Sequence, residues 1–149
     1  ELMGNSQLLS QMVLNAVGGD YYEILTEKKY PSGYAATCTV AGNEFKDNEL
    51  PALVGELPDL SAYDTIILVY PLWWNTIPMA VKSFLLKEDL SGKTLLPIVT
   101  HGGSKAGKSE EALKEACSAD VLSPICIFDD DVTGCRKSLG KALEEALLK

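Results

Sequence analysis

The sequence has little positive charge and only one histidine. Its 149 residues include 13 Lys and Arg against 21 Asp and Glu, which gives a formal net charge of −8 at pH 7. Nonspecific attraction to nucleic acid or to an anionic membrane is therefore not expected. The acidity either favours a basic protein partner or serves only to keep the domain soluble.

Long hydrophobic runs and familiar catalytic motifs are also missing. No apolar run approaches the roughly 20 residues that span a bilayer, so we expect no membrane span. The GxSxG, HExxH and P-loop patterns are absent, which leaves hydrolase and kinase functions without support. The four cysteines form no CxxC pair and have no histidine set nearby, so we expect reduced, mostly buried residues rather than a metal site or disulfides: Cys38, Cys117, Cys126 and Cys135.

The composition is that of one globular domain over residues 1–149. Hydrophobic residues make up 46% and charged residues 23% of the chain, which excludes disorder as its main state. A chain of this length buries roughly two thirds of the surface that it exposes when unfolded. Asp129-Asp130-Asp131 lacks the spacing of a calcium loop, and we interpret it as a solvated turn.

The most informative stretch runs from Thr65 to Leu85. Its first five residues, Thr65–Val69, have no polar alternation, which predicts a parallel strand that is buried on both faces. Pro71 then forces a turn, and a helix follows, with Thr76 as its cap and Pro78 in its first turn. Trp73 and Trp74 lie in the loop between them, at the kind of strand end where open α/β sheets bind ligands. Either these indoles form a platform for a flat aromatic cofactor, or they are packing residues, and we expect one of them to pack inward.

A second loop of this kind lies downstream. Residues 94–100 predict another strand, although Pro97 would normally place that strand at a sheet edge. The following Thr100-His101-Gly102-Gly103 is a loop in which glycine allows backbone amides to approach a ligand. His101 is either simply solvated or hydrogen-bonded to a ligand.

A third candidate segment opens the chain. Residues 7–17 have helical periodicity, with Asn5 or Ser6 as the N-cap. Free amides at the start of this helix, preceded by Gly4, predict an anion pocket. A capped helix without an anion is the alternative.

The rest of the chain predicts alternating helices and strands. We expect a strand at 20–25, a long and partly irregular connection over 26–48, and a short helix between Glu49 and Tyr63 that is broken by Pro58. A helix capped by Ser109, a strand at 121–128 and a final helix at 133–148 complete the pattern.

In its two loops and their order, the sequence resembles the flavodoxin-like family over nearly the whole chain. The resemblance implies an α/β three-layer sandwich in which helices cover both faces of a parallel sheet with strand order 2-1-3-4-5. The first, central strand of that pattern is missing, because only Glu1, Leu2 and Met3 precede Gly4. We expect a trimmed or partly represented protein, in which either the second strand closes against the third or another copy supplies the pairing in a homodimer.

The resemblance further implies a noncovalent FMN site. Its phosphate would lie at the first helix, its ring against Trp73 or Trp74, and its polar edge at the amides near Asn75 and Gly102-Gly103. The family often has glycine where Asn75 stands. The full predicted cofactor-binding set is Gly4, Asn5, Ser6, Pro71, Leu72, Trp73, Trp74, Asn75, Thr100, His101, Gly102 and Gly103.

Three functions are consistent with these observations. The first is a cytoplasmic FMN flavodoxin that carries electrons between protein partners, and its acidity would lower the second reduction potential of the flavin. The second is a flavin enzyme that reduces a quinone with NAD(P)H, which needs an open face over the ring. The third is a flavin-free binding or assembly module on the same scaffold.

Overall fold

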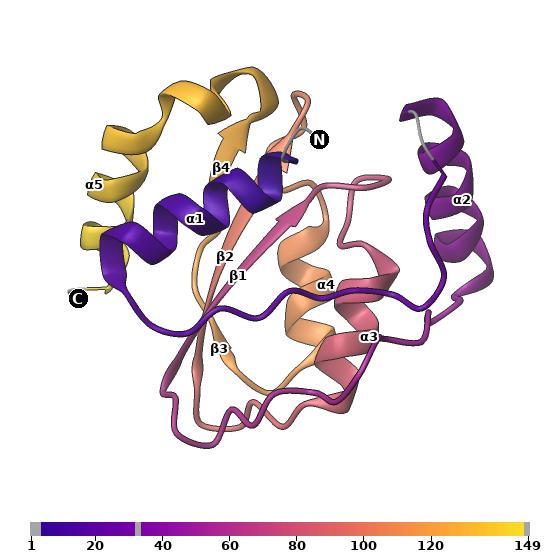
Figure 1. Cartoon of the computed structure of the whole chain (residues 1–149), viewed down its shortest axis with the longest axis horizontal. Coiled ribbons are helices and arrows are strands. Elements are labelled where there is room, and N and C mark those ends of the chain that lie inside the picture. Colours follow the sequence, from indigo (N-terminus) through magenta and orange to yellow (C-terminus); the bar gives the residue numbers. More distant parts are fainter. Residues whose placement is uncertain (1–3, 32–33, 148–149) are drawn as a thin grey trace.

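The computed structural model describes residues 4–31 and 34–147, which form three layers with a parallel sheet in the middle (Figure 1). α1 and α5 cover one face of the sheet, α3 and α4 cover the other, and α2 lies beside α3. No described helix is long and apolar enough to cross a membrane. The helices are α1 (Asn5–Val17), α2 (Tyr34–Asp47), α3 (Met79–Lys87), α4 (Ser109–Ala116) and α5 (Arg136–Leu147), with a 3-10 helix η1 (Asp129–Gly134) before α5.

β2 is the central strand of the described sheet. It pairs in parallel with β1 on one side and with β3 and β4 on the other. The strands are β1 (Thr65–Pro71), β2 (Thr94–His101), β3 (Asp120–Val121) and β4 (Ile125–Phe128). The α/β class and the strands predicted from their apolar runs are thus confirmed, except that the last one is divided in two.

Pro97 explains this division. The Leu95 carbonyl accepts the Leu122 N–H at 2.9 Å, so odd-numbered residues of β2 direct their backbone groups toward β3 and β4. Pro97 has no N–H to offer on that side. Pairing is interrupted there, and resumes at Ile98 opposite Ile125. A proline is therefore accommodated in a central strand because the neighbouring strand is broken opposite it.

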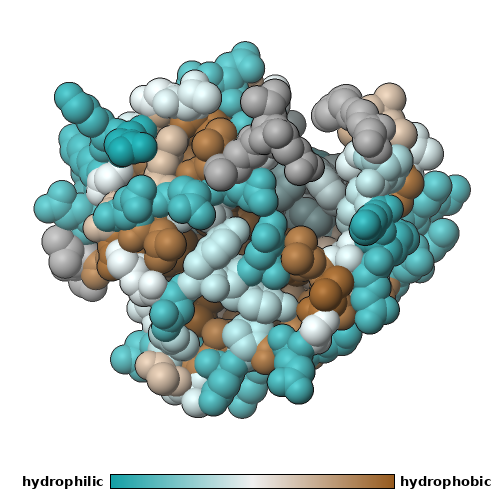
Figure 2. Space-filling model, in the orientation of Figure 1, coloured by the Kyte–Doolittle hydropathy of each residue, from teal (hydrophilic) through white to brown (hydrophobic). Residues whose placement is uncertain are grey.

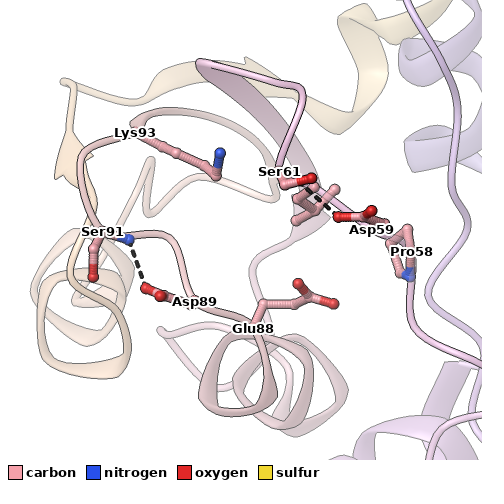
Figure 3. Close-up of a pocket in the computed structure, with 8 residues that line it drawn as sticks. Pro58, Asp59, Ser61, Glu88, Asp89, Ser91 and Lys93 are labelled. Atoms are coloured by element: carbon pink, nitrogen blue, oxygen red, sulfur yellow. Dashed lines mark hydrogen bonds between the residues drawn. The ribbon is translucent and has the colours of Figure 1, made fainter.

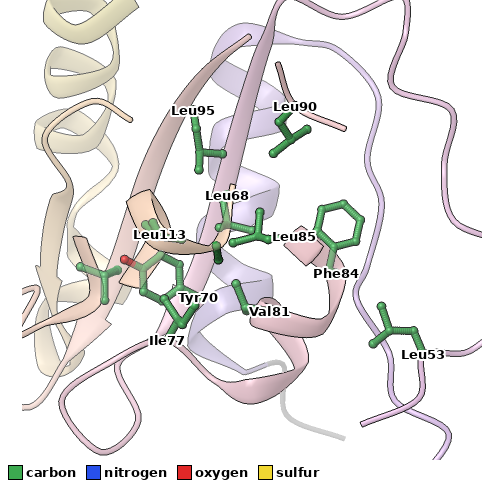
Figure 4. Packing of buried hydrophobic residues seen from close by; sticks show 12 residues of the cluster. Leu53, Leu68, Tyr70, Ile77, Val81, Phe84, Leu85, Leu90, Leu95 and Leu113 are labelled. Carbon is green, nitrogen blue, oxygen red and sulfur yellow. The ribbon is translucent and has the colours of Figure 1, made fainter. Parts of the chain in front are cut away.

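Side chains of the sheet alternate between two apolar clusters. Leu95 and Val99 of β2 pack toward α3 and α4, in the cluster that Figure 4 shows. Leu96 and Ile98 pack toward α1 and α5. The hydroxyl of the fully buried Tyr70 shares a 2.8 Å hydrogen bond with Ser109, and burial raises the pKa of Tyr70 to about 12. β2 is thus buried on both faces, as its apolar run predicts. The same prediction for Thr65–Val69 of β1 was too strong, because only Leu68 of that run is buried and the rest is half-buried or exposed.

The strand predicted at 20–25 does not form. Tyr22 and Ile24 pack against the α3 and α4 cluster while their neighbours are exposed, which is the alternation of an extended segment. Within the described part of the chain, the backbone pairing beside it is an isolated antiparallel bridge between Thr26, the next residue, and Leu53. The prediction was wrong because alternation specifies an extended chain but not a neighbouring strand to pair with.

Between residues 26 and 63, one helix was not predicted and one predicted helix does not form. The connection expected to be partly irregular contains α2, and Ala41 and Glu44 are buried among its described side chains. The short helix expected between residues 49 and 63 is absent, and that segment runs through Pro51 and through Gly55 with φ +72°. Proline lacks the amide that a helix needs, and a left-handed glycine interrupts helical geometry.

The N-caps of α3 and α4 differ from the predicted ones: α3 begins later and α4 begins earlier. Pro78, not Thr76, is the N-cap of α3, and Lys108, not Ser109, is the N-cap of α4. The Ser109 hydroxyl lies inside the fold, where it contacts Tyr70 and the Ala106 carbonyl. Glu1, Leu2, Met3 and Leu148 lie outside the described residues, so the expectation of a missing first strand stays a prediction.

Candidate functional site

The three predicted ligand segments meet at the carboxyl edge of the sheet. β1 ends at Pro71, β2 at His101 and β4 at Phe128. The start of α1 lies beside them, because the Asn5 side-chain amide donates to Asp129, the residue that follows β4, at 3.5 Å. This edge is where parallel α/β sheets bind ligands.

In the first turn of α1, backbone amides have no hydrogen-bond partner among residues 4–31 and 34–147. Gly4 is the N-cap in place of the predicted Asn5 or Ser6, and its N–H donates to the Gln7 side chain at 3.2 Å. The first backbone bond of the helix runs from the Leu8 N–H to the Gly4 carbonyl at 3.0 Å. The N–H groups of Asn5, Ser6 and Gln7 have no helical carbonyl ahead of them, so they are available to an anion.

The tryptophan loop is a two-residue hairpin turn. The backbones of Trp73 and Thr76 exchange hydrogen bonds of 3.0 and 3.1 Å. Trp74 and Asn75, between them, have φ of 51° and 65°. Positive φ at both central residues is typical of a type I′ turn, in which asparagine is favoured and tryptophan is not.

The two indoles of this loop have different neighbours. Trp74 is 57% exposed, and its indole N–H donates to the Cys38 carbonyl of α2 at 2.8 Å. Trp73 is half-buried and lies edge-to-face with Tyr30, with ring centroids 5.4 Å apart. Trp73 is therefore the candidate platform for a flat ring, and Trp74 secures α2 beside it.

Backbone hydrogen bonds fasten the tryptophan loop to the loop after β2. The Leu72 N–H donates to the Thr100 carbonyl at 2.8 Å, and the Lys108 N–H donates to the Asn75 carbonyl at 2.7 Å. Gly107 permits the second contact, because a Cβ at its position would lie 2.2 Å from the Asn75 side-chain oxygen. The loops predicted to form the site are thus held in one arrangement by each other.

His101 is buried rather than solvated. Its side chain is 8% exposed and packs against Phe128, with ring centroids 5.9 Å apart. The Gly103 N–H donates to His101 Nδ1 at 3.0 Å. An acceptor at Nδ1 leaves the proton of the neutral ring on Nε2. The contact orders the exposed Gly102-Gly103 segment at the site.

A cavity of about 890 Å³ reaches this edge. Ser6 of α1, Pro71, Trp73 and Tyr30 line its upper end, and it continues along β1 beneath residues 18–30. The surface is hollowed between the start of α1 and α2 (Figure 2). The other predicted residues do not line this cavity. They are Gly4, Asn5, Leu72, Trp74, Asn75, Thr100, His101, Gly102 and Gly103.

A second, smaller cavity of about 330 Å³ lies at the opposite end of β1 and β2 (Figure 3). It is lined by Asp59, Glu88, Asp89 and Lys93, among others. Asp59 and Asp89 each accept a backbone N–H two residues later at 3.0 Å, just ahead of a strand. Burial, and then the nearby Asp59 carboxylate, raise the pKa of Glu88. These contacts form turns at the entry to the sheet, far from the ligand loops.

Sequence reasoning missed the contribution of α2 and of the segment before it. Tyr30, Cys38, Gly42 and Glu44 all support the tryptophan loop, directly or through one neighbour. No periodicity or motif marks them, because each contact joins residues that are distant in the sequence.

Comparisons with a family profile and with solved structures agree on one family. A sequence profile described as flavodoxin matches residues 3–145. Structures from Bacteroides uniformis and Bacteroides eggerthii, both provisionally described as flavoproteins, are similar, with 27% and 25% identity and TM-scores of 0.78 and 0.80. These alignments cover 91% and 100% of this chain, and 87% and 94% of the others.

A flavoprotein from Lactobacillus acidophilus, solved in complex with FMN, shares the fold at 14% identity. Its TM-score is 0.64, with 89% of this chain and 90% of the other covered. Comparison with curated protein sequences gives no significant match.

Proposed function

Because the chain belongs to the flavodoxin family, we propose that it binds FMN noncovalently at the carboxyl edge and carries electrons between protein partners. One observation carries the proposal: Ser6, in the amide-rich first turn of α1, and Trp73 line the same cavity. An anion site and an aromatic wall on one cavity suit a phosphate-bearing flat ring. The FMN bound to the Lactobacillus acidophilus structure supports the same choice of cofactor.

Each segment of the chain has a separate role in this proposal. The amides of Asn5, Ser6 and Gln7 hold the phosphate, and the Trp73 indole stacks against the ring. The exposed Gly102 amide serves the polar edge of the ring, while the Gly103 N–H is held by His101 Nδ1. When bound, the flavin supplies the redox chemistry, while the protein orients it and sets the charge around it.

The partner in this proposal is a basic redox protein in the cytoplasm. The net charge is −8, and three adjacent carboxylates, Asp129–Asp131, are exposed where β4 reaches the carboxyl edge. Negative charge beside the site attracts a basic partner and accelerates association at low ionic strength. It also disfavours an anionic reduced flavin, which suits single-electron donation.

The test is a titration of FMN and of riboflavin into the purified chain, followed by flavin fluorescence. We expect quenching by FMN and about tenfold weaker binding of riboflavin, since riboflavin lacks the phosphate. Trp73→Ala should weaken FMN binding by about tenfold or more, whereas Trp74→Phe should leave it nearly unchanged. Absence of FMN binding would leave the flavin-free binding or assembly module.

A second function is favoured by the length of the cavity. It continues along β1 beyond Trp73, which leaves room for another ligand near a bound ring. This room suits an NAD(P)H-dependent quinone reductase. Steady oxidation of NADH or NADPH by the FMN-loaded protein with a quinone would establish that function, and no turnover would leave the electron carrier.

A further inference from the structure

A buried carboxylate lies behind the aromatic wall of the cavity. Glu44 of α2 is 1% exposed. One of its carboxylate oxygens accepts the Tyr30 hydroxyl at 2.6 Å, and the other lies 2.8 Å from the Lys28 ammonium. A buried carboxylate is costly unless it is paired and hydrogen-bonded, so these two partners sustain its charge inside the protein.

Tyr30 connects this carboxylate to the tryptophan loop. Its hydroxyl is bound to Glu44 at one end, and its ring lies at 72° to the Trp73 indole. A tyrosine side chain has two rotatable bonds, so two fixed contacts determine where the ring lies. Burial, and then the bond to Glu44, raise the pKa of Tyr30, which keeps the hydroxyl protonated as the donor.

Glu44, Tyr30 and Lys28 form one polar network, and its Lys28 end is charged and partly exposed. Lys28 is 41% exposed and also lies 3.5 Å from Glu49, whose side chain is 55% exposed. The bond with Glu44, chiefly, raises the pKa of Lys28. Lys28 and Tyr30 therefore join one buried carboxylate to solvent on one side and to the wall of the cavity on the other.

We propose that Glu44 is a positioning residue for the cavity, which acts through Tyr30 to hold the Trp73 indole in the orientation that receives a flat ring. The inference rests on the proposed function for the identity of that ring. Trp74 contacts α2 at other residues, Cys38 and Gly42. The mobility of Trp73 therefore reports on the contact with Tyr30, and that of Trp74 reports on the contact with α2.

The experiment uses the two tryptophans of the chain as separate reporters. In a Trp74→Phe background, Trp73 is the sole indole, and in a Trp73→Phe background Trp74 is. Time-resolved fluorescence anisotropy is measured without flavin for Glu44→Ala, Glu44→Gln and Tyr30→Phe in each background. We expect Trp73 to become more mobile in Glu44→Ala and Tyr30→Phe, while Trp74 stays as it is.

Glu44→Gln is the matched control, because its amide oxygen still accepts the Tyr30 hydroxyl. It should preserve both the Trp73 anisotropy and FMN affinity, whereas Glu44→Ala should weaken FMN binding about tenfold. Tyr30→Phe keeps the ring and the charge pair, so it tests the same link if Glu44→Ala does not fold.

Unchanged Trp73 mobility in Glu44→Ala and Tyr30→Phe would overturn the proposal. Equal loosening of both tryptophans would also overturn it, because Glu44 would then only attach α2. If the unmodified chain binds no FMN, the proposed function fails, yet the anisotropy still decides whether Glu44 positions Trp73.

Discussion

The Trp74 indole lies directly against Gly42 of α2, with no room for a side chain between them. A Cβ built on Gly42 would lie 2.7 Å from two carbon atoms of the indole ring. The indole N–H completes the contact by donating to the Cys38 carbonyl, one turn earlier in α2. This close approach attaches α2 to the turn that carries Trp73.

Gly42→Ala should therefore destabilise the protein by about 1–3 kcal/mol, because the added methyl group displaces the indole. Urea denaturation gives the free energy of unfolding, and near-UV circular dichroism reports the tryptophan environment. Gly140→Ala is the matched control: Gly140 also lies within a helix, but a Cβ there meets nothing within 4 Å. It should stabilise by about 0.5–1 kcal/mol through helix propensity. Stabilisation by both substitutions would contradict the contact.

Gly107→Ala should loosen the attachment between the two ligand loops. Gly107 has φ +51°, and a Cβ would lie 2.7 Å from the Asn75 carbonyl as well as against its side chain. Gly92→Ala shares the backbone strain, with φ +77°, but meets no atom within 4 Å. We expect Gly92→Ala to cost about 1–2 kcal/mol in urea denaturation. Gly107→Ala should cost about 1–3 kcal/mol more and weaken FMN binding. Equal losses would show that the loops do not depend on this contact.

Buried apolar runs predicted the central part of the fold well. The strand that contains Pro97 is buried on both faces, and hydrophobicity alone reveals it. Thr65–Val69 forms the predicted parallel strand but is mostly half-buried. The carboxyl edge as the site also follows from the order of strands and loops. The sequence does not reveal which tryptophan faces the cavity and which one contacts α2, because this depends on a turn in which Trp74 takes a left-handed conformation.

α2 could not be predicted because its stability comes from distant contacts. The helix contains Gly42 and two threonines, Thr37 and Thr39, which are poor helix formers. Glu44 is polar, so periodicity assigns it to the surface, yet it is buried and is paired with Tyr30 and Lys28. Residues whose burial depends on a specific polar partner give no hydrophobic signal in the sequence.

Glu88→Gln should stabilise the protein at neutral pH. The raised pKa of Glu88 means that the fold disfavours its charged form, through burial and then through repulsion by Asp59. Below the unfolded carboxyl pKa of about 4.3, Glu88 is protonated in both states and does not destabilise the fold. As the pH rises through the higher pKa of the folded state, Glu88 becomes charged and lowers the free energy of unfolding. The gain from Glu88→Gln should therefore appear above that range and vanish below about pH 4. Urea denaturation at several pH values measures it, with the exposed Glu56→Gln as control. A gain that persists at low pH would point to a cause other than charge.

The outer edge of β1 should exchange its amide hydrogens faster than the inner edge. The Asp64 carbonyl accepts the Thr94 N–H, and the Leu72 N–H donates to Thr100, so even-numbered residues of β1 face β2. The N–H groups of Ile67 and Val69 then face the cavity. Among the described residues, no backbone carbonyl on the far side of the cavity accepts a hydrogen bond from them. Pro71, with no N–H, ends the same edge.

Hydrogen exchange followed by NMR compares neighbours within one strand, so global stability affects them equally. We expect slow exchange at Ile66 and Leu68 and exchange faster by about tenfold or more at Ile67 and Val69, since an unpaired amide opens without breaking the ladder. Equal protection at all four positions in a monomeric sample would mean that residues 20–25 close onto β1 in solution. Protection that rises with protein concentration would instead show that a second copy covers the edge.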